Sequence, residues 1–524
     1  MTVPACQNEV AEFLRAITGS APTETHISAV FVGNNDVFKL KKAVRLPFLD
    51  FSTLAARRDM TGRELELNRQ SAPGIYRGVH AIVRTANGSL SLADVDEAGA
   101  LDYVVRMARV PETDFLDVMA RNSALTPALL EALGDAVADL HARFLPVANW
   151  DSFAGMRAIV QGNAAAARAA GLKPHIIDKW LHDTLAELER IAPALATRAQ
   201  AGRVRRAHGD LHLGNICLWE GRPTAFDMLE FDDALATIDL GYDLAFLLMD
   251  LEFHAGRVAA NRVMNRYLAR TGDASLLALL PCFLSVRAMV RAHVQASRGV
   301  SAEAARYLEM AQAALQPAPS LMVAIGGLQG SGKTTLARAL APELGRPPGA
   351  LLVRSDEIRK RLHGALPEQK LPAAAYSPGA NASVNSALLE AAETGAHSGQ
   401  AVIVDSTFLH APLRHGVEAA ARRTKIPFLG LWLTAPMETM LQRVSTREHD
   451  ASDAGPDVLR AAAELDPGRI SWRAVPADDA YGALAAGRAE IARLPVAHRS
   501  AAPPAAPHVW AGQRSSGHGH DDDE

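Results

Sequence analysis

The chain has 524 residues, more than one hydrophobic core usually supports, so two domains and possibly a third are expected. Its 48% hydrophobic and 21% charged residues are typical of a globular protein and exclude a disordered or fibrous one. A formal net charge of −4 without a strongly basic block makes nucleic acid an unlikely partner.

The spacing of the cysteines and the length of the apolar runs indicate the cellular compartment of the protein. Cys6, Cys217 and Cys282 lie far apart without metal-type or paired spacing, as expected of structural thiols in a reducing cytosol. No N-terminal segment combines a basic start with an apolar stretch, and runs such as 244–249 are too short to span a membrane. We therefore expect a cytoplasmic protein without a membrane partner.

The first domain, expected over residues 1–315, begins with short strand-like runs and becomes largely helical after about residue 112. The runs AVFVG at 29–33 and DVFKLKK at 36–42 predict strands, and a helix is expected over 61–70. This order predicts a small β-rich lobe joined to a larger α-rich lobe.

The sequence HGDLHLGN at 208–215 carries the main chemical signal of this domain. In protein-kinase-like catalysis an aspartate accepts the proton of the substrate hydroxyl, an asparagine further along binds Mg²⁺, and a second aspartate after the next hairpin holds the other metal contacts. Asp210, Asn215 and Asp227 have the spacing for these roles, with a hairpin that turns at 221–222. A polar surface loop is the alternative interpretation.

The pattern H-G-D-x-x-x-x-N followed by F-D-x-x-E-F resembles the aminoglycoside phosphotransferase family over roughly residues 25–300. The resemblance implies a two-lobed kinase-like fold that uses ATP and Mg²⁺. Asp243, within 238–251, resembles the buried aspartate that supports the catalytic loop from behind, which is a structural role. Antibiotic resistance does not follow, because acceptor pockets diverge within one fold.

Kinase-like lobes also need a strand lysine for the α- and β-phosphates and a helical glutamate that holds it. Lys39 and Lys41 lie on one face of their strand because side chains alternate, and Glu64 is the expected partner. Lys39 is the first choice, with Lys41 close behind because sequence does not define the register. The segment 102–112 fits the hinge between the lobes, whereas the glycine-rich turn of protein kinases is only faintly present at 32–36.

A change of composition at 316–320 is interpreted as a linker, and 321–495 is expected to form a second domain. Strands and helices alternate there, which predicts an α/β domain with a parallel sheet between helices, after the α+β kinase-like domain. The stretch 496–524 loses periodicity and is expected to be a disordered tail. In the second domain, strands are expected at 321–326, 350–354, 401–405 and 427–434, and helices from 333 and at 356–363, 381–396, 411–423 and 436–446.

Residues 327–334, GLQGSGKT, fit the phosphate-binding pattern G-x-x-x-x-G-K-[ST] between an apolar strand and a helix. Glycines allow a tight turn whose N–H groups and helix N-terminus face the phosphates of ATP. Lys333 is expected to reach the β- and γ-phosphates, and the Thr334 hydroxyl to bind Mg²⁺. The other expected nucleotide-binding residues are Gly327, Gly330, Ser331, Gly332 and Thr335.

Three further elements favour a kinase over a mechanical ATPase. Asp356 and Arg359 share one helix face, where the carboxylate can accept a hydroxyl proton and the arginine can hold the acceptor or the phosphate. Asp405 ends the third strand and is expected to serve Mg²⁺ through water. Arg443 and Arg447 are candidates for a lid over the transferred phosphoryl group, with surface ion pairs as the alternative.

The second domain resembles the small P-loop kinases related to polynucleotide kinase, gluconate kinase and zeta-toxin proteins, and the order of the two halves resembles a family of bifunctional bacterial proteins. The resemblance implies phosphoryl transfer to a hydroxyl, with Asp356 as the candidate base. The acidic segment 448–457 disfavours an oligonucleotide, so a small polyol or nucleoside-like acceptor is expected. A regulatory ATP-binding protein and a nucleic-acid end-processing kinase are the alternatives.

Overall fold

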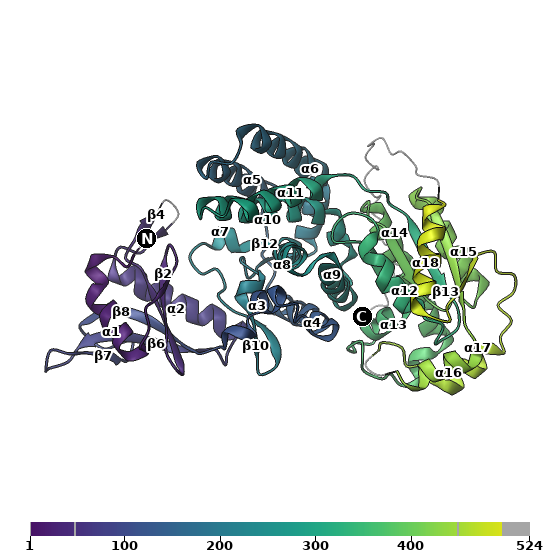
Figure 1. Cartoon of the computed structure of the whole chain (residues 1–524), viewed down its shortest axis with the longest axis horizontal. Coiled ribbons are helices and arrows are strands. Elements are labelled where there is room, and N and C mark those ends of the chain that lie inside the picture. The colour runs from purple at the N-terminus through teal and green to yellow at the C-terminus, as the bar shows by residue number, and fades with distance from the viewer. Residues whose placement is uncertain (1, 47–48, 448–449, 495–524) are drawn as a thin grey trace, which may run out of the picture.

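The computed structural model describes residues 2–46, 49–447 and 450–494, so the tail expected over 496–524 lies outside the described residues. Three blocks lie in a row: a small N-terminal lobe, a helical lobe and a sheet-based C-terminal half (Figure 1). Within the described ranges, no helix has the length and apolarity needed to cross a bilayer.

The N-terminal lobe is an antiparallel sheet in the order β1-β2-β3-β8-β6-β7 between two helices. Phe38 and Leu40 of β3 pack in the same core as α1, so the alternating side chains of Lys39 and Lys41 point to the face that α2 covers. This lobe contains α1 (Asn8–Thr18), β1 (Thr23–Glu24), β2 (Ser28–Val32), β3 (Asp36–Lys41), α2 (Leu54–Ser71), β6 (Tyr76–Arg84), β7 (Leu90–Ala93) and β8 (Ala100–Ala108).

The helical lobe is organised around α8, which is buried on every side from Leu240 to Leu251 and therefore lies at its centre. Two short antiparallel strand pairs, β9 with β12 and the hairpin of β10 with β11, frame the loop at 207–215. The elements are α3 (Leu116–Arg121), α4 (Pro127–Arg143), α5 (Ser152–Ala169), α6 (Pro174–Gln200), β9 (Val204–Arg206), β10 (Ile216–Trp219), β11 (Arg222–Ala225), α7 (Asp233–Ala236), β12 (Thr237–Asp239), α8 (Leu240–Ala255), α9 (Arg257–Thr271), α10 (Leu280–Ser297) and α11 (Ser301–Leu315).

The turn between β10 and β11 differs by one residue from the prediction. Trp219 pairs with Arg222, so Glu220 and Gly221 form the turn, rather than residues 221–222. Both turn residues have positive φ, 50° and 74°, as a two-residue hairpin turn requires. Glutamate seldom adopts this conformation, which is why the sequence pointed to a turn that starts at the glycine.

The C-terminal half is a five-stranded parallel sheet in the order β14-β15-β13-β16-β17, flanked by helices, which confirms the predicted fold class. Strand β17 and helices α17 and α18 were not predicted. The elements are β13 (Met322–Gly326), α12 (Lys333–Leu340), β14 (Leu351–Arg354), α13 (Ser355–Leu362), α14 (Pro378–His397), β15 (Val402–Asp405), α15 (Ala411–Thr424), β16 (Phe428–Thr434), α16 (Met437–Ser445), α17 (Pro456–Ala463), β17 (Arg473–Pro476) and α18 (Ala480–Ala492).

The two halves share one hydrophobic core, which runs from the helical lobe to one face of the parallel sheet. Helix α9 lies along the edge strand β14, where Asn265 acts as a substitute for a neighbouring strand. Asn265 Oδ1 accepts a hydrogen bond from Leu352 N at 2.7 Å, and its Nδ2 donates to Ala350 O at 3.1 Å. Backbone groups at the edge of the sheet thereby find hydrogen-bond partners in the other half of the chain.

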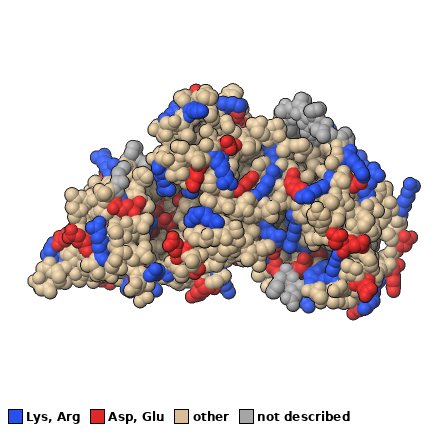
Figure 2. All heavy atoms as spheres, viewed as in Figure 1, with Lys and Arg blue, Asp and Glu red and all other residues tan. Residues whose placement is uncertain are grey.

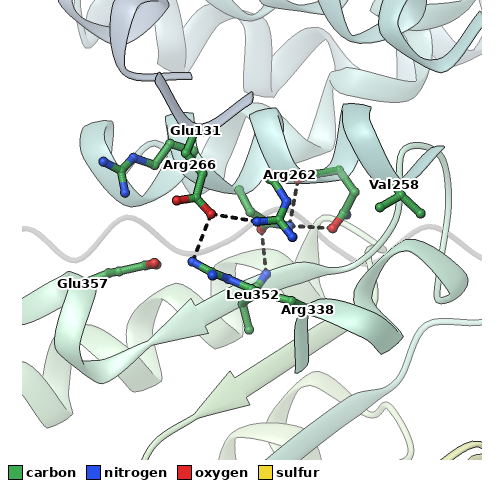
Figure 3. A pocket seen from close by; sticks show the side chains of 9 residues that line it. Glu131, Val258, Arg262, Arg266, Arg338, Leu352 and Glu357 are labelled. Carbon is green, nitrogen blue, oxygen red and sulfur yellow. Dashed lines mark hydrogen bonds and ion pairs between the residues drawn. The ribbon is translucent and has the colours of Figure 1, made fainter. Parts of the chain in front are cut away.

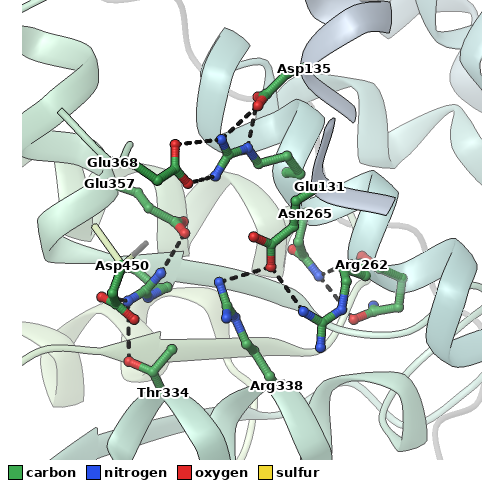
Figure 4. Close-up of polar contacts among 12 residues, drawn as sticks. Glu131, Asp135, Arg262, Asn265, Thr334, Arg338, Glu357, Glu368 and Asp450 are labelled. Carbon is green, nitrogen blue, oxygen red and sulfur yellow. Dashed lines mark hydrogen bonds and ion pairs between the residues drawn. The ribbon is translucent and has the colours of Figure 1, made fainter. Parts of the chain in front are cut away.

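Ion pairs surround this contact (Figures 3 and 4). Arg266 of α9 bridges Asp135 of α4 and Glu368, with the shortest distance to each carboxylate at 2.6 Å. Glu131 of α4 pairs with Arg262 at 2.9 Å and with Arg338 at 3.2 Å, at one side of a small pocket of about 40 Å³. Because Arg338 belongs to α12, the helix that begins at the P-loop touches the helical lobe directly.

We expect Asn265→Ala to weaken the edge of β14, because the buried N–H of Leu352 loses its acceptor. One unsatisfied buried group costs about 1–3 kcal/mol, which corresponds to a roughly 5- to 150-fold faster amide exchange if the group opens locally. Hydrogen exchange of peptides that cover 350–354 measures this. Asn122→Ala, at an exposed position, is the control, and unchanged exchange in Asn265→Ala would contradict the role of this contact.

Candidate active sites

The loop at 207–215 is held from behind by Asp243, in the first turn of α8. Its carboxylate accepts hydrogen bonds from His208 N at 2.9 Å and Gly209 N at 3.0 Å, and His141 Nε2 lies 3.3 Å from it. Burial alone would raise the pKa of Asp243, but His141 and His208 keep it below its ordinary value. An ionised, buried carboxylate therefore fixes the backbone of the loop, as expected for Asp243.

Asp210 lies at the open side of this loop, with its side chain 44% exposed. Asn215 Nδ2 donates to both the backbone O and Oδ2 of Asp210, each at 3.0 Å, and His212 Nε2 lies 3.5 Å from Oδ2. Burial alone would raise the pKa of Asp210, but the interactions with His212 and His208 have the larger effect and lower its pKa. Asp210 is thus ionised at neutral pH and can accept a hydrogen bond from an alcohol.

A second cluster joins the two lobes around Glu64 of α2, which has no exposed surface. Lys39 Nζ donates to Glu64 Oε1 at 2.8 Å and also bonds Asp227, whereas Lys41 Nζ donates to Glu64 Oε2 at 2.7 Å and also bonds Glu230. Burial would raise the pKa of Glu64, but the two lysines lower it to about 2. Lys39 keeps 12% exposure and Lys41 only 1%, so Lys39 is the lysine that a nucleotide can reach.

The aspartate expected to bind metal, Asp227, is brought beside the catalytic loop. Phe226 N donates to Asn215 O at 3.0 Å, and the His208 ring is 2.9 Å from Phe226 O. Asp227 has φ of 61°, a left-handed conformation that costs energy and is more frequent at functional sites. Asn215 and Asp227 supply the amide and carboxylate oxygens that Mg²⁺ prefers, so the residues fit that ion.

The P-loop lies between β13 and α12, and its predicted glycines have φ of 138° at Gly327, 79° at Gly330 and 93° at Gly332. A Cβ atom at Gly327 would lie 2.5 Å from Leu433 O, and one at Gly330 would lie 2.5 Å from Met440 O. Neither contact is possible for a side chain, and the φ values are unfavourable for other residues. Glycine is thus required here by both backbone shape and close packing.

Lys333 and Thr334 of the P-loop lie at the carboxyl ends of the strands, where ligands of open α/β sheets bind. Lys333 Nζ donates to Leu328 O of the same loop at 2.8 Å, and burial lowers the pKa of Lys333. Thr334 Oγ1 donates to Asp405 Oδ2 at 2.6 Å. A hydroxyl beside a carboxylate matches the oxygen ligands of Mg²⁺, so this pair also fits that ion.

Arg354, at the end of β14, was not predicted as a site residue; Figure 4 labels two of its partners, Glu357 and Asp450. Arg354 is buried and pairs with Glu357 at 2.7 Å, Asp450 at 3.1 Å and Asp405 at 3.4 Å. One buried guanidinium thus joins carboxylates from α13, β15 and the segment after α16. In the sequence, its position at the end of a strand, directly before Ser355 and Asp356, could have identified Arg354 as a site residue. Glu230, also missed, lies in the F-D-x-x-E-F pattern.

A pocket of about 1250 Å³ opens at the P-loop and brings together most of the predicted residues of this half. Gly327 and Ser331 belong to the same loop but do not line the pocket, and Ser331 is fully buried. The predicted residues that line it are Gly330, Gly332, Lys333, Thr334, Thr335, Asp356, Arg359, Asp405, Arg443 and Arg447.

Asp356 and Arg359 lie in the same pocket on α13 but have different partners. Burial raises the pKa of Asp356 above its ordinary value, although Arg354 opposes this effect. Arg359 lies over the ring of Tyr376, 4.7 Å from its centroid, and donates to Ala375 O at 2.6 Å. Asp356 is therefore a carboxylate with raised proton affinity, beside a guanidinium fixed on an aromatic ring.

Arg443 and Arg447, the two arginines expected in a lid, have different surroundings. Arg443 donates to the backbone oxygens of Gly330, Ala477 and Asp478 at 3.3, 3.0 and 2.7 Å, so it connects the P-loop with the end of β17. Arg447 lines the pocket. Neither has a carboxylate partner among the ion pairs of the described residues.

The acidic segment after α16 was expected to disfavour an oligonucleotide, but two of its carboxylates have partners within the protein. Asp450 pairs with Arg354, and Asp453 pairs with Lys360 at 2.7 Å and accepts a hydrogen bond from Tyr376 at 2.6 Å. Residues 448–449 lie outside the described residues. Because the charges of both aspartates are compensated internally, this segment repels an anionic acceptor less than the sequence suggested.

Comparisons with known proteins divide the chain in the same way. Residues 77–279 match the model of the "Phosphotransferase enzyme family", and residues 322–465 match that of an "AAA domain". Three uncharacterized proteins of Mycobacterium bovis and Mycobacterium tuberculosis are 29% identical over 462 residues, which cover 84% of this chain and 89% of theirs.

Each of the similar solved structures matches only one of the two halves of the chain. A sugar kinase from Janibacter is 20% identical and covers 33% of this chain and 95% of its own, with a TM-score of 0.26. The aminoglycoside phosphotransferase APH(4)-Ia is 16% identical and covers 59% of this chain and 98% of its own, with a TM-score of 0.34. By the two family matches, the chain combines a domain of the phosphotransferase enzyme family with a P-loop domain of the AAA type.

Proposed function

We propose that the protein is an ATP-dependent kinase with two active sites, each of which transfers the γ-phosphoryl group to a hydroxyl of a small molecule. The proposal is supported by the presence, in each half, of a lysine and a carboxylate with the surroundings expected for phosphate binding and for a hydroxyl acceptor. Lys39 and Asp210 supply these groups in the N-terminal half, and Lys333 and Asp356 supply them in the C-terminal half.

In the N-terminal site Lys39, held by Glu64, binds the α- and β-phosphates of ATP. Asp210 orients the acceptor hydroxyl and receives its proton as the new P–O bond forms and the bond from the γ-phosphorus to the β,γ-bridging oxygen breaks, with ADP as the leaving group. Its lowered pKa makes this transfer late, after the hydroxyl oxygen has begun to bond with phosphorus. Mg²⁺ held by Asn215 and Asp227 would neutralise charge on the phosphates.

In the C-terminal site the P-loop backbone and Lys333 hold the phosphates. Asp356 accepts the proton of the acceptor hydroxyl, and its raised pKa makes it the stronger base of the two carboxylates. Arg447 faces the same pocket and can stabilise charge on the transferred group. Mg²⁺ held by Thr334 and Asp405 would supply charge neutralisation there.

The surface charge favours a small acceptor over a nucleic acid. On the face seen in Figure 2, basic and acidic side chains are interspersed over the described part of the chain, without a basic stripe. A protein that binds the phosphate backbone of a nucleic acid usually presents such a stripe. The activity is therefore assigned to small-molecule acceptors.

We expect Asp210→Asn and Lys333→Ala each to remove one of two acceptor-dependent activities. Loss of the carboxylate should lower N-terminal turnover by about 10²- to 10⁴-fold, and loss of the lysine should lower C-terminal turnover by about 10²- to 10³-fold. ADP release with a metabolite panel measures both, and the double variant should lack both. Full turnover in the double variant would refute the assignment. If only one variant loses activity, the other half is regulatory.

Lys39 and Lys41 should respond differently to replacement by methionine. Lys39→Met should lower kcat/KM for ATP by about 10- to 100-fold, the effect of one charge-assisted hydrogen bond. Lys41→Met leaves Glu230 and part of Glu64 unpaired in the interior and should cost about 3–5 kcal/mol of unfolding free energy. Steady-state kinetics and urea unfolding separate the two effects. The opposite pattern would assign the phosphate-binding role to Lys41.

The pH profile of the C-terminal site should report Asp356. A base acts when ionised, and a raised pKa means that ionisation is lost at a higher pH than for an ordinary aspartate. In the Asp210→Asn background, log kcat/KM should fall with slope one on the acid side, with an apparent pKa above that of an ordinary aspartate. Asp356→Asn should flatten this limb, while circular dichroism verifies folding at each pH. A limb that is unchanged in Asp356→Asn would exclude it as the base.

A further inference from the structure

The pocket at the P-loop has room for a second molecule beside the nucleotide. Its volume of about 1250 Å³ exceeds the roughly 300–1,000 Å³ that is usual for one small ligand. The lining continues from the P-loop along α13 to the chain between α13 and α14 and to the start of α14. We call the part of the pocket lined by Asp356, Arg359, Lys370, Tyr376 and Asn381 the acceptor end.

Contacts between these residues hold the acceptor end together. The guanidinium of Arg359 lies over the ring of Tyr376, and Asn381 Nδ2 donates to Tyr376 O at 3.1 Å. Asp356 and Arg359 are three positions apart on α13, so their side chains are neighbours on one helix face. A molecule that touches Arg359 in this pocket is therefore also within reach of Asp356, the expected base.

The cation at the centre of the acceptor end has no anionic partner. Arg359 is only 9% exposed, and its Nη1 donates to a single backbone oxygen, that of Ala375, at 2.6 Å. Its Nε is buried without a hydrogen-bond partner among the described residues. Arginine keeps its charge in proteins, and a buried guanidinium normally has a carboxylate or phosphate beside it. This surrounding points to an anionic ligand.

A second cation, Lys370, is held at the same end by its neighbours in the chain. Asp453 accepts hydrogen bonds from Leu371 N at 3.0 Å and from Tyr376 Oη at 2.6 Å. Lys360, which pairs with Asp453 at 2.7 Å, also donates to the backbone oxygen of the residue directly before Lys370. The backbone on both sides of Lys370 is thus fixed beside Tyr376. The ammonium group of Lys370 has no carboxylate partner among the ion pairs of the described residues.

The start of α14 adds a weaker positive contribution. Pro378 and Asn381, in the first turn of this helix, line the pocket. The helix is 20 residues long, and the N-terminus of a helix carries a partial positive charge that favours an anion within about one turn. The dipole of α14 therefore acts in the same direction as the two side-chain cations.

The carboxylates of the pocket do not compensate these charges. Three of the four carboxylates in the described part of the lining already have a cationic partner within the protein, namely Asp405, Asp450 and Asp453. Asp356 is the fourth, so the acceptor end contains one available carboxylate against Arg359, Lys370 and the helix dipole. A neutral polyol would leave this excess positive charge uncompensated, whereas an acceptor with an anionic group would balance it.

We propose that the acceptor of the C-terminal site is a small hydroxyl compound with one anionic group, a carboxylate or a phosphate, which Arg359 and Lys370 bind. The inference rests on the proposed function of that site and specifies its substrate class. With the anion at these cations, the hydroxyl lies beside Asp356. Its oxygen bonds to the γ-phosphorus of ATP as its proton passes to Asp356, and the bond to the β,γ-bridging oxygen breaks with ADP as the leaving group.

The test uses the full chain with Asp210→Asn, so that only the C-terminal site transfers phosphate. A saturating non-hydrolysable ATP analogue with Mg²⁺ occupies the P-loop, which prevents the probes from binding there. The probes are pairs that differ in the anionic group: D-glycerate and glycerol, D-gluconate and D-sorbitol, and D-ribose 5-phosphate and D-ribose. By calorimetry, we expect at least one anionic member to bind at least 10-fold more tightly than its neutral partner. The carboxylate pairs and the phosphate pair show which anionic group the site prefers.

Two variants locate the anion in the pocket. Arg359→Gln should weaken binding of the anionic member about 10- to 100-fold, the effect of a charge-assisted hydrogen bond. Lys370→Gln should weaken it about 2- to 5-fold, because this side chain is exposed. Lys370→Gln removes no internal contact, so it tests the inference even if Arg359→Gln is poorly folded. Arg422→Gln is the matched control, because Arg422 is exposed and does not line the pocket.

Three results would overturn the inference. They are an anionic member that binds no more tightly than its neutral partner in all three pairs, binding of the anionic member that neither variant weakens, and an equal loss in Arg422→Gln.

Transfer of labelled phosphate from ATP separates the inference from the proposed function. We expect the bound anionic member to be phosphorylated, and this transfer to be lost in Asp356→Asn. Transfer that persists in Asp356→Asn would contradict the proposed function of the C-terminal site. If transfer requires Asp356 but kcat/KM is the same for the anionic member and its neutral partner, only the substrate class is wrong.

Discussion

A fully buried carboxylate, Glu64, determines how the N-terminal half is assembled. A charge without water needs compensation, and the two lysines of β3 provide it, one on each carboxylate oxygen. The same lysines reach Asp227 and Glu230 beyond the expected hinge, so the strand, the helix and the segment of Asp227 and Glu230 have one relative arrangement. Disturbing this cluster therefore moves Lys39 and Asp227 together.

In the C-terminal half, the backbone of the P-loop takes the place that the pair of lysines has in the N-terminal half. Glycines with positive φ shape the P-loop, and packing against β16 and α16 excludes side chains from it. The buried Arg354 joins carboxylates from α13, β15 and the segment after α16. Strand β14, which ends at Arg354, is itself completed by Asn265 of the helical lobe, so the two sites belong to one continuous structure.

The parts of the sites that depend on short-range spacing were predictable from sequence. HGDLHLGN and GLQGSGKT each place their chemical groups within eight residues, and the surrounding strands and helices only orient them. The parallel sheet followed from the alternation of strands and helices for the same reason. The choice between Lys39 and Lys41 was not predictable, because both contact Glu64 and only the exposure of Lys39 and its contact with Asp227 distinguish them.

Contacts between distant segments were not predictable. Glu230 meets Lys41 across 189 positions, and Asn265 meets Leu352 across 87, without a spacing rule for either pair. The charges of Asp450 and Asp453 suggested a repulsive acidic segment, whereas tertiary ion pairs compensate them. Tertiary structure thus determined the remaining features.

Two active sites on one chain require that each chain binds two Mg-ATP molecules at separate places. The most direct measurement is the stoichiometry of a non-hydrolysable ATP analogue with Mg²⁺, by calorimetry and native mass spectrometry. We predict two molecules per chain for the wild type, one for Lys333→Ala and one for Lys39→Met. A wild type that binds one molecule or none at saturating Mg²⁺ would rule out two nucleotide sites.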